Sequence, residues 1–201
     1  MSARHAALAL ALLGLALLAD PWGWQTLRTS TAGQDWHRML RVLGYVPTWG
    51  AVGLALMLQD RAVGRGLRVI GAAGLAGLLA NLGKLLIRRE RPAPDGLYRF
   101  RDWADRPWDL TDLGMPSGHS AVAFGAAFAL GHLYPRTRPL LLALATGCAM
   151  TRVMEGAHFL SDVVASVAIG ALAAAGVARL AERVTGEAAQ SQILLSRKSQ
   201  Q

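Results

Sequence analysis

The sequence predicts an all-α protein, a bundle of six membrane-spanning helices in a single domain. Hydrophobic residues make up 53% of the 201 residues, above the roughly 45–50% that is usual in soluble domains. Charged residues make up only 17%, and they cluster between apolar runs of nearly membrane-spanning length. Six such runs leave no room for a separate soluble domain.

Each expected helix corresponds to one apolar run. In order, the runs are residues 6–19, 42–58, 69–87, 120–134, 140–153 and 163–177. The first run could be a signal peptide, since a basic start precedes it. We favour an uncleaved helix, because Trp22 and Trp24 follow it like an interfacial belt and a clear cleavage site is missing. The predicted domain is 1–181, followed by a polar C-terminal tail, 182–201.

The formal net charge of +8 would first suggest nucleic-acid binding in a soluble protein. Hydropathy outweighs that interpretation, and a basic balance suits lipid headgroups or a phosphorylated substrate. Lys and Arg are nearly equal on the two sides of the predicted bundle, but net charge is more positive on the side of the termini. We therefore expect both termini in the cytoplasm, and we assign the single cysteine, Cys148, to helix packing.

Two cations follow the third run. Lys84 shares a helix face with small residues, which predicts that it points into the bundle. Alone, such a lysine could simply extend its amine to the membrane interface. Arg91 follows two helical turns later, and Pro92 then ends the helix. Two cations held together indicate an anion between them.

A Gly-containing turn and a histidine precede the fourth run. One interpretation of Ser117 or Ser120 is a helix N-cap that bonds free backbone N–H groups. The same helix N-terminus, with Gly118 in its turn, would also bind an anion, because its N–H groups and dipole favour negative charge. His119 lies beside it and could transfer a proton. This segment is therefore a candidate phosphate site.

A third cluster follows the fifth run. His158 and Asp162 are four residues apart and share a helix face if the helix begins before His158. A lone His–Asp pair is more often structural, but Arg152 on the same side favours function. Asp162 would hold one ring nitrogen protonated and leave the other with a free lone pair. Glu155 lies between Arg152 and His158, and we expect it not to touch the site.

All three clusters fall on one side of the predicted bundle. This placement predicts a single site for phosphoryl transfer that uses no metal and no cofactor. Lys84, Arg91 and Arg152 would neutralise the charge on the transferring group, as Mg²⁺ does in kinases. Three nearby cations would also repel a divalent ion. The histidines expected to lie outside the site are His5, His37 and His132.

These residues resemble the three-part signature of the type 2 phosphatidic acid phosphatase family, whose membrane members have six helices. The matching residues are Lys84, Arg91 and Pro92, then Pro116, Ser117, Gly118 and His119, then Arg152, His158 and Asp162. Together they span residues 84–162. Thr151 departs from the pattern, which usually has serine there, but it keeps a hydroxyl.

The resemblance implies a role for each matched residue. His158 would be the nucleophile that forms a phosphohistidine, and Asp162 would orient its ring. His119 would protonate the leaving oxygen and then activate water. The phosphate would be held by Lys84, Arg91, Ser117, Gly118 and Arg152. Because His158 must be neutral and His119 protonated at the first step, we expect activity in a limited pH window.

The predicted function is a membrane-embedded, metal-independent lipid phosphatase, whose partners are membrane lipids and not nucleic acid. The expected substrates are polyprenyl diphosphates or glycerophospholipid phosphates, such as phosphatidic acid and phosphatidylglycerol phosphate. The alternatives with the same site are a lipid A phosphatase, a lipid phosphotransferase and a vanadate haloperoxidase, although the haloperoxidases are soluble. A non-enzymatic protein that binds anionic lipid is the alternative of another class. The Ala, Leu and Arg content favours a bacterial inner membrane, with the site facing the periplasm.

The segment 94–115 alternates arginines and aspartates around Trp103 and Trp108. Such interleaving predicts a short amphipathic segment that lies at the membrane interface over the site. The alternative is a solvated loop with internal ion pairs. In the first case the segment could gate the site or select the headgroup.

Overall fold

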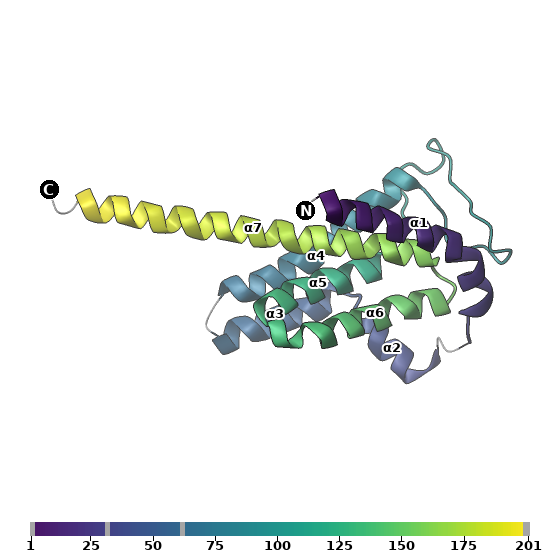
Figure 1. Cartoon of the computed structure of the whole chain (residues 1–201), viewed down its shortest axis with the longest axis horizontal. Coiled ribbons are helices and arrows are strands. Elements are labelled where there is room, and N and C mark those ends of the chain that lie inside the picture. Colours follow the sequence, from purple (N-terminus) through teal and green to yellow (C-terminus); the bar gives the residue numbers. More distant parts are fainter. Residues whose placement is uncertain (1–2, 31–32, 61–62, 199–201) are drawn as a thin grey trace.

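The computed structural model describes residues 3–30, 33–60 and 63–198, with side chains up to Val184. This part of the chain is all-α, as predicted, and contains seven α-helices and a short 3-10 helix, η2 (Figure 1). Their bounds are α1 Ala3–Thr26, α2 Asp35–Val42, α3 Val46–Asp60, α4 Val63–Ile87, α5 Gly118–Leu133, η2 Pro135–Thr137, α6 Arg138–Met154 and α7 Leu160–Lys198.

The second predicted run, 42–58, corresponds to α3, and the structure adds a short helix before it, α2, that was not predicted. Val42 ends α2, and α3 begins at Val46 after a bend of 65° between the two axes. Pro47 therefore lies in the first turn of α3, where its missing N–H costs no helical hydrogen bond. The prediction of a helix that begins at residue 42 and continues unbroken is wrong here, and the break brings the loop of residues 43–45 towards α5.

Three helices in the described part of the chain are long and apolar enough to cross a membrane. They are α1, α4 and the Leu160–Val184 part of α7. The bent pair α2 and α3 would be a fourth span if both cross as one unit. With 16 and 17 residues, α5 and α6 are shorter than these three, and a span typically needs about 20 residues. The protein thus has membrane helices, and the complete six-span bundle stays a prediction.

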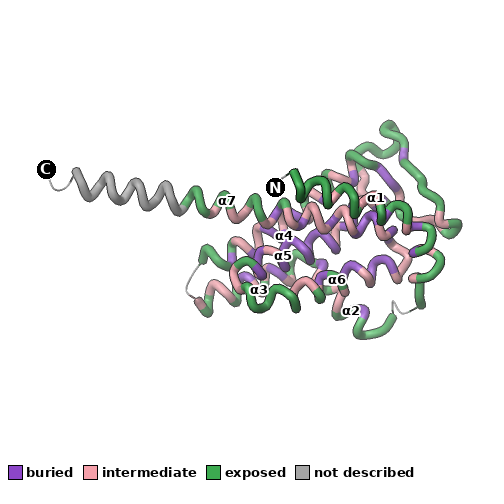
Figure 2. The backbone as a smooth tube through the Cα atoms, in the orientation of Figure 1, coloured by how far each residue is buried: buried purple, intermediate pink, exposed green. Residues whose placement is uncertain are grey.

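The helix α5 is the centre of the bundle, with α4, α6 and α7 packed around it (Figure 2). Its buried residues are mostly alanine and glycine. A Cβ added to Gly125 of α5 would lie 2.8 Å from the carbonyl oxygen of Ala72 of α4. A Cβ added to Gly170 of α7 would lie 2.7 Å from the backbone nitrogen of Gly125. The backbones approach this closely because small residues stand at both crossings.

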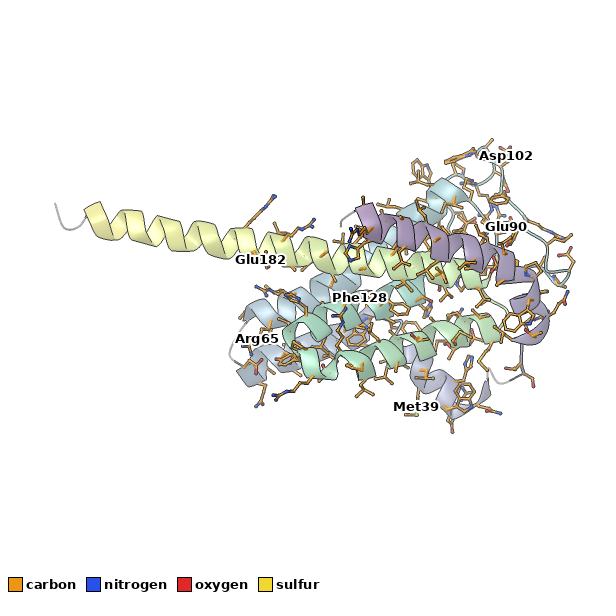
Figure 3. The ribbon with its side chains drawn as sticks, viewed as in Figure 1. Met39, Arg65, Glu90, Asp102, Phe128 and Glu182 are labelled. Atoms are coloured by element: carbon orange, nitrogen blue, oxygen red, sulfur yellow. The ribbon has the colours of Figure 1, made fainter. Side chains whose placement is uncertain are left out.

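The connection between α4 and α5 lies at one end of the bundle, with Glu90 and Asp102, while Arg65 lies at the other end (Figure 3). The structure has no helix over residues 94–115. Exposed ion pairs join its side chains instead, including Arg99 to Asp95 at 2.7 Å. The segment is therefore an irregular loop with internal ion pairs, and it also exposes Trp103 and Trp108; its position at the membrane interface over the site stays a prediction.

Two buried arginines organise this loop. Arg88 follows α4 with a φ of 56°, and its guanidinium donates hydrogen bonds to the carbonyl oxygens of Asp102 (2.7 Å) and Pro107 (3.2 Å). Arg101 is also buried and donates to the carbonyl oxygen of Asp109 at 3.0 Å. Each guanidinium offers five donors, so two side chains satisfy carbonyl groups that a loop without regular structure leaves unpaired.

The C-terminal helix is longer than predicted. The expected domain ended at residue 181 and was followed by a polar tail, whereas α7 continues to Lys198. The last three residues of that tail lie outside the described residues. At its other end, α7 packs against α1 and α4 as well as α5, so its first turns are held within the bundle.

The crossing of α5 and α7 yields a stability prediction. Gly170→Val should lower the free energy of unfolding by about 1–3 kcal/mol, because overpacking forces closely packed neighbours apart. The matched control is Gly176→Val on the same helix, where the nearest atom to an added Cβ is 3.9 Å away. Thermal unfolding in detergent, followed by circular dichroism, measures both variants. Equal melting temperatures for the two variants would contradict the packing described here.

Candidate active site

The first turn of α7 fixes a buried His–Asp pair. His158 Nδ1 lies 3.3 Å from Oδ2 of Asp162, and the backbone N–H of Phe159 donates to the same oxygen at 2.9 Å. The helix begins at Leu160, so the condition for a shared helix face is not met and His158 lies just before the helix. Asp162 reaches back over the helix start, as an acidic residue does in a capping box. The arrangement leaves Nε2 of His158 as the ring nitrogen without this partner.

Arg89 and Asp20 are part of this centre, although the sequence did not single them out. Arg89 is only 2% exposed, and its guanidinium donates to the carboxylate of Asp162 and to Oγ of Ser161 at 2.7 Å. Asp20, near the end of α1, accepts a hydrogen bond from the Ser161 backbone at 2.9 Å and lies 3.9 Å from Arg89. The sequence feature that could have marked Asp20 is its position, as a charged residue directly after the first apolar run.

The N-terminus of α5 presents unpaired donors. Ser117 precedes the helix, but its side chain makes no capping hydrogen bond and instead accepts one from Ser120 at 3.0 Å. The N-cap interpretation therefore does not hold for Ser117. The first-turn N–H groups remain available to an anion. Beside them, Nε2 of His119 is buried and has no hydrogen-bond partner in the described part of the chain. The ring of Tyr45 packs edge-on against the His119 ring, with 4.7 Å between the two ring centroids.

A cavity of about 650 Å³ lies between these elements, within the range of roughly 300–1,000 Å³ that is typical of ligand sites. The predicted residues that line it are Lys84, Arg91, Gly118, His119 and His158. Asp162 lies behind His158, and its backbone carbonyl accepts a hydrogen bond from the N–H of Ser117 at 3.2 Å. The structure thus brings clusters from three distant parts of the chain to one cavity.

Arg152 joins the same centre from the end of α6. Its side chain is 6% exposed, and its charge acts on Lys84, His119 and His158. One terminal nitrogen pairs with Glu155. Within the described residues, Nε of Arg152 is buried and has no hydrogen-bond partner. Arg152 therefore offers an unused donor in the same centre as the unpartnered Nε2 of His119.

Glu155 connects the site to α2, contrary to the expectation that it stays outside. Besides Arg152, its carboxylate contacts Arg41 at 3.1 Å and Nδ1 of His37 at 3.4 Å. Nε2 of His37 lies 3.1 Å from the carbonyl oxygen of Thr151. His37 thus has partners that its sequence position did not reveal. These contacts follow from the break between α2 and α3, which lets the short helix α2 pack against α6.

Burial is the main electrostatic influence on His158, which precedes the α7 span. It lowers the pKa of His158 below the ordinary value of 6.5, because desolvation disfavours the imidazolium. The hydrogen bond to Asp162 opposes this shift. The net direction keeps His158 neutral at neutral pH, which is the state required of a nucleophile.

These observations define a helical membrane protein with two histidines, several cations and a helix N-terminus around one open cavity. Residues 65–185, more than half of the chain, match the PAP2 superfamily. The chain therefore belongs to the PAP2 superfamily, which confirms the resemblance drawn from the three motifs.

The curated proteins that this chain resembles are named as phosphatases of lipid or lipid-linked phosphates. The chain is 42% identical over 131 residues to a lipid A 1-phosphatase of Rhizobium johnstonii, an alignment that covers 61% of this chain and 53% of that protein. It is 35% identical over 104 residues to a decaprenylphosphoryl-5-phosphoribose phosphatase of Mycobacterium tuberculosis, covering 51% and 54% respectively. The chain thus spans about half the length of the curated relatives it matches.

A solved structure supports the fold. The crystal structure of Aquifex aeolicus LpxE superposes with a TM-score of 0.60 over 83% of this chain and 94% of that chain, at 20% sequence identity. At this identity the likeness concerns the fold alone, and it covers nearly all of the solved protein.

The buried Arg89–Asp162 pair yields a second prediction. Arg89→Gln should lower the free energy of unfolding by about 3–5 kcal/mol, because it leaves the buried Asp162 carboxylate without its cation. Arg99→Gln is the matched control: it breaks the exposed pair with Asp95, and such surface pairs are worth about 0–1 kcal/mol. Chemical denaturation in mild detergent compares the two. A loss for Arg89→Gln no larger than for the control would contradict the buried pair.

Proposed function

We propose that the chain is an integral membrane lipid phosphatase that works through a phosphohistidine at His158. One observation carries the proposal. The Asp162 carboxylate holds Nδ1 of His158 at 3.3 Å, while His158 and His119 both line the same cavity. One ring is oriented for attack on phosphorus, and the other stands where a leaving group would need a proton.

In the first step, the Nε2 lone pair of His158 attacks the phosphorus, and the bond from phosphorus to the lipid oxygen breaks. His119 donates its proton to that oxygen, which leaves as the lipid alcohol or phosphate. Asp162 accepts the Nδ1–H bond and stabilises the positive charge that His158 acquires. Lys84, Arg91 and Arg152 stabilise the charge on the transferring oxygens, as do the N–H groups at the start of α5.

In the second step, neutral His119 removes a proton from water, and the resulting hydroxide attacks the phosphohistidine. The bond between Nε2 and phosphorus breaks, inorganic phosphate forms, and His158 returns to its neutral state. The buried and unpartnered Nε2 of His119 is consistent with both tasks, because no group among the described residues competes for it. All of these groups come from this chain, so the proposed cycle needs no metal ion and no cofactor.

For the substrate, we propose a lipid A-type glycolipid phosphate. The relatives at 41–42% identity are named lipid A 1-phosphatases, and they favour this alternative over the polyprenyl diphosphate or glycerophospholipid phosphate expected from the sequence. The relative at 35% identity acts, by its name, on a decaprenyl-linked phosphoribose. Polyprenyl-linked phosphates are therefore the second candidate class.

We further propose one membrane domain, residues 1–181, in a bacterial inner membrane with the site on the periplasmic side. The cavity lies at the end of the bundle that carries the loop of residues 88–117, and the basic termini belong to the opposite side in the six-span topology. A lipid A-type headgroup would approach such a site from the outer leaflet.

Phosphate release tests the proposed reaction. The purified chain should release inorganic phosphate from lipid A 1-phosphate in the presence of EDTA, and faster than from phosphatidic acid or decaprenyl diphosphate. His158→Ala should reduce the rate at least about 10³-fold, as expected when a nucleophile is removed. Asp60→Asn, which removes a carboxylate that pairs with Arg65 far from the site, is the control. Full activity of His158→Ala would contradict the mechanism, and a strict Mg²⁺ requirement would contradict its metal independence.

The pH profile tests the state of His158. Only the neutral ring attacks phosphorus, and burial lowers its pKa below 6.5. The value of kcat/KM should therefore persist as the pH falls through 6.5 and decline only at lower pH, because the neutral form survives to that point. Steady-state rates in overlapping buffers measure the acidic limb. A midpoint of that limb above about 7 would contradict a buried, neutral nucleophile.

A further inference from the structure

A second cavity, of about 480 Å³, lies at the opposite end of the bundle from the candidate active site. The helices themselves show the separation. Arg68 in the first turns of α4 lines this cavity, whereas Lys84 at the end of the same helix lines the first one. Likewise, Leu133 at the end of α5 lines this cavity, and His119 at the start of α5 lines the other.

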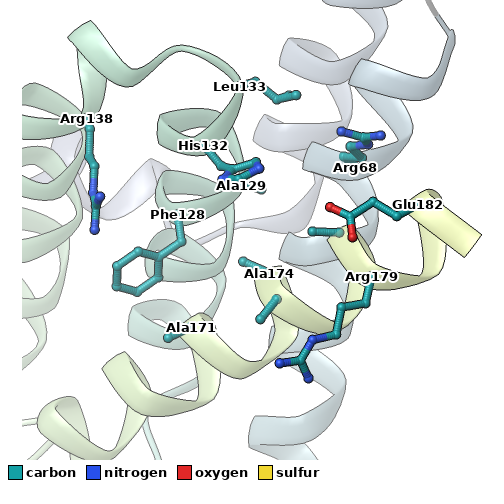
Figure 4. Close-up of a pocket in the computed structure, with 12 residues that line it drawn as sticks. Arg68, Phe128, Ala129, His132, Leu133, Arg138, Ala171, Ala174, Arg179 and Glu182 are labelled. Atoms are coloured by element: carbon teal, nitrogen blue, oxygen red, sulfur yellow. The ribbon is translucent and has the colours of Figure 1, made fainter. Parts of the chain in front are cut away.

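One wall of the cavity is apolar and smooth. Ala171, Ala174, Ala175 and Ala178 follow the spacing of a single face of α7 and line it together. Phe128 of α5 lies across from Ala171 and Ala174 (Figure 4). The wall stays open because α6 makes little contact with α7. Alanine side chains leave a shallow channel that suits an extended hydrocarbon chain.

The polar side of the cavity is strongly basic. Arg68, Arg138 and Arg179 line it, with His132, against one carboxylate, that of Glu182. Arg68, Glu182 and Arg179 lie on one side, and Arg138 lies on the other (Figure 4). Within the described residues, none of these three arginines has a protein hydrogen-bond or ion-pair partner; Arg138 and Arg179 are exposed, and Nε of Arg68 is buried without a partner.

This lack of partners sets the three arginines apart from the buried arginines at the other end. Arg88, Arg89 and Arg152 all have carbonyl or carboxylate partners. Three cations around one concave, partly apolar space favour an anion that is attached to a hydrocarbon tail. Arginine suits the phosphate of such a ligand, because its planar fork matches phosphate oxygens.

We propose that this cavity binds one anionic phospholipid from the membrane leaflet opposite the active site. The phosphate would lie in the cavity between Arg138 on one side and Arg68 and Arg179 on the other, and an acyl chain would follow the alanine face of α7. The ligand is a bound lipid and not a substrate, since none of the groups assigned to phosphoryl transfer lines this cavity. The inference is independent of the proposed reaction.

Native mass spectrometry of the full chain in detergent tests this site. Phosphatidylglycerol should bind with a stoichiometry of one, at least about tenfold more tightly than phosphatidylcholine with the same acyl chains. Arg138→Gln combined with Arg179→Gln should remove that preference. Arg136→Gln is the matched control, since it removes an exposed arginine that lies two residues from Arg138 and does not line the cavity.

Two further measurements identify the ligand. Ala174→Leu should fill part of the channel and weaken phosphatidylglycerol binding while leaving the basic rim intact. Inorganic phosphate should bind the wild-type chain far more weakly than the lipid does. The proposal is overturned if phosphatidylcholine binds equally well, if Arg136→Gln has the same effect as the double variant, or if free phosphate binds as tightly as the lipid. Because each readout is binding, none depends on phosphatase activity.

Discussion

The buried carboxylate of Asp162 is the interaction on which the rest of the structure depends. A carboxylate inside a helical membrane bundle is costly unless cations and donors surround it. Arg89 supplies the cation, Phe159 supplies a backbone donor and His158 supplies a ring nitrogen. Because these groups must all contact Asp162, the end of α4 and the start of α7 lie close together. The groups that neutralise Asp162 also orient the nucleophile proposed here.

The geometry of the bundle explains how one short helix, α5, contributes residues to both cavities. The small residues of α5 let it pack closely against both α4 and α7. Its N-terminus carries His119 into the active-site cavity, and its C-terminal half forms part of the second cavity. An interior of alanine and glycine contributes less burial per residue than one of leucine, but it permits the close backbone contacts that membrane helices use.

Sequence reasoning reached the apolar runs and the three motifs, because both are local patterns. Run length and charge spacing mark helices, and Lys84, His119 and His158 occur within recognisable motifs. The break between α2 and α3 was missed because residues 42–45 are apolar and continue the apolar pattern of α3, while the polar helix α2, apart from Val42, lies outside the run. Arg89, Glu155 and His37 were missed for another reason. Arg89 pairs with Asp162, and His37 pairs with Glu155, across long stretches of sequence, so only the folded structure shows these contacts.

The central claim is that groups from separate segments surround one phosphoryl group beside His158. The most direct measurement is a cryo-electron microscopy structure of the full chain with orthovanadate, which resembles the transition state of phosphoryl transfer. The account predicts vanadium bonded to Nε2 of His158, with its oxygens contacted by Lys84, Arg91 and Arg152 and with His119 at the apical position. Vanadate bound elsewhere, or bound with His158 turned away from it, would contradict the account.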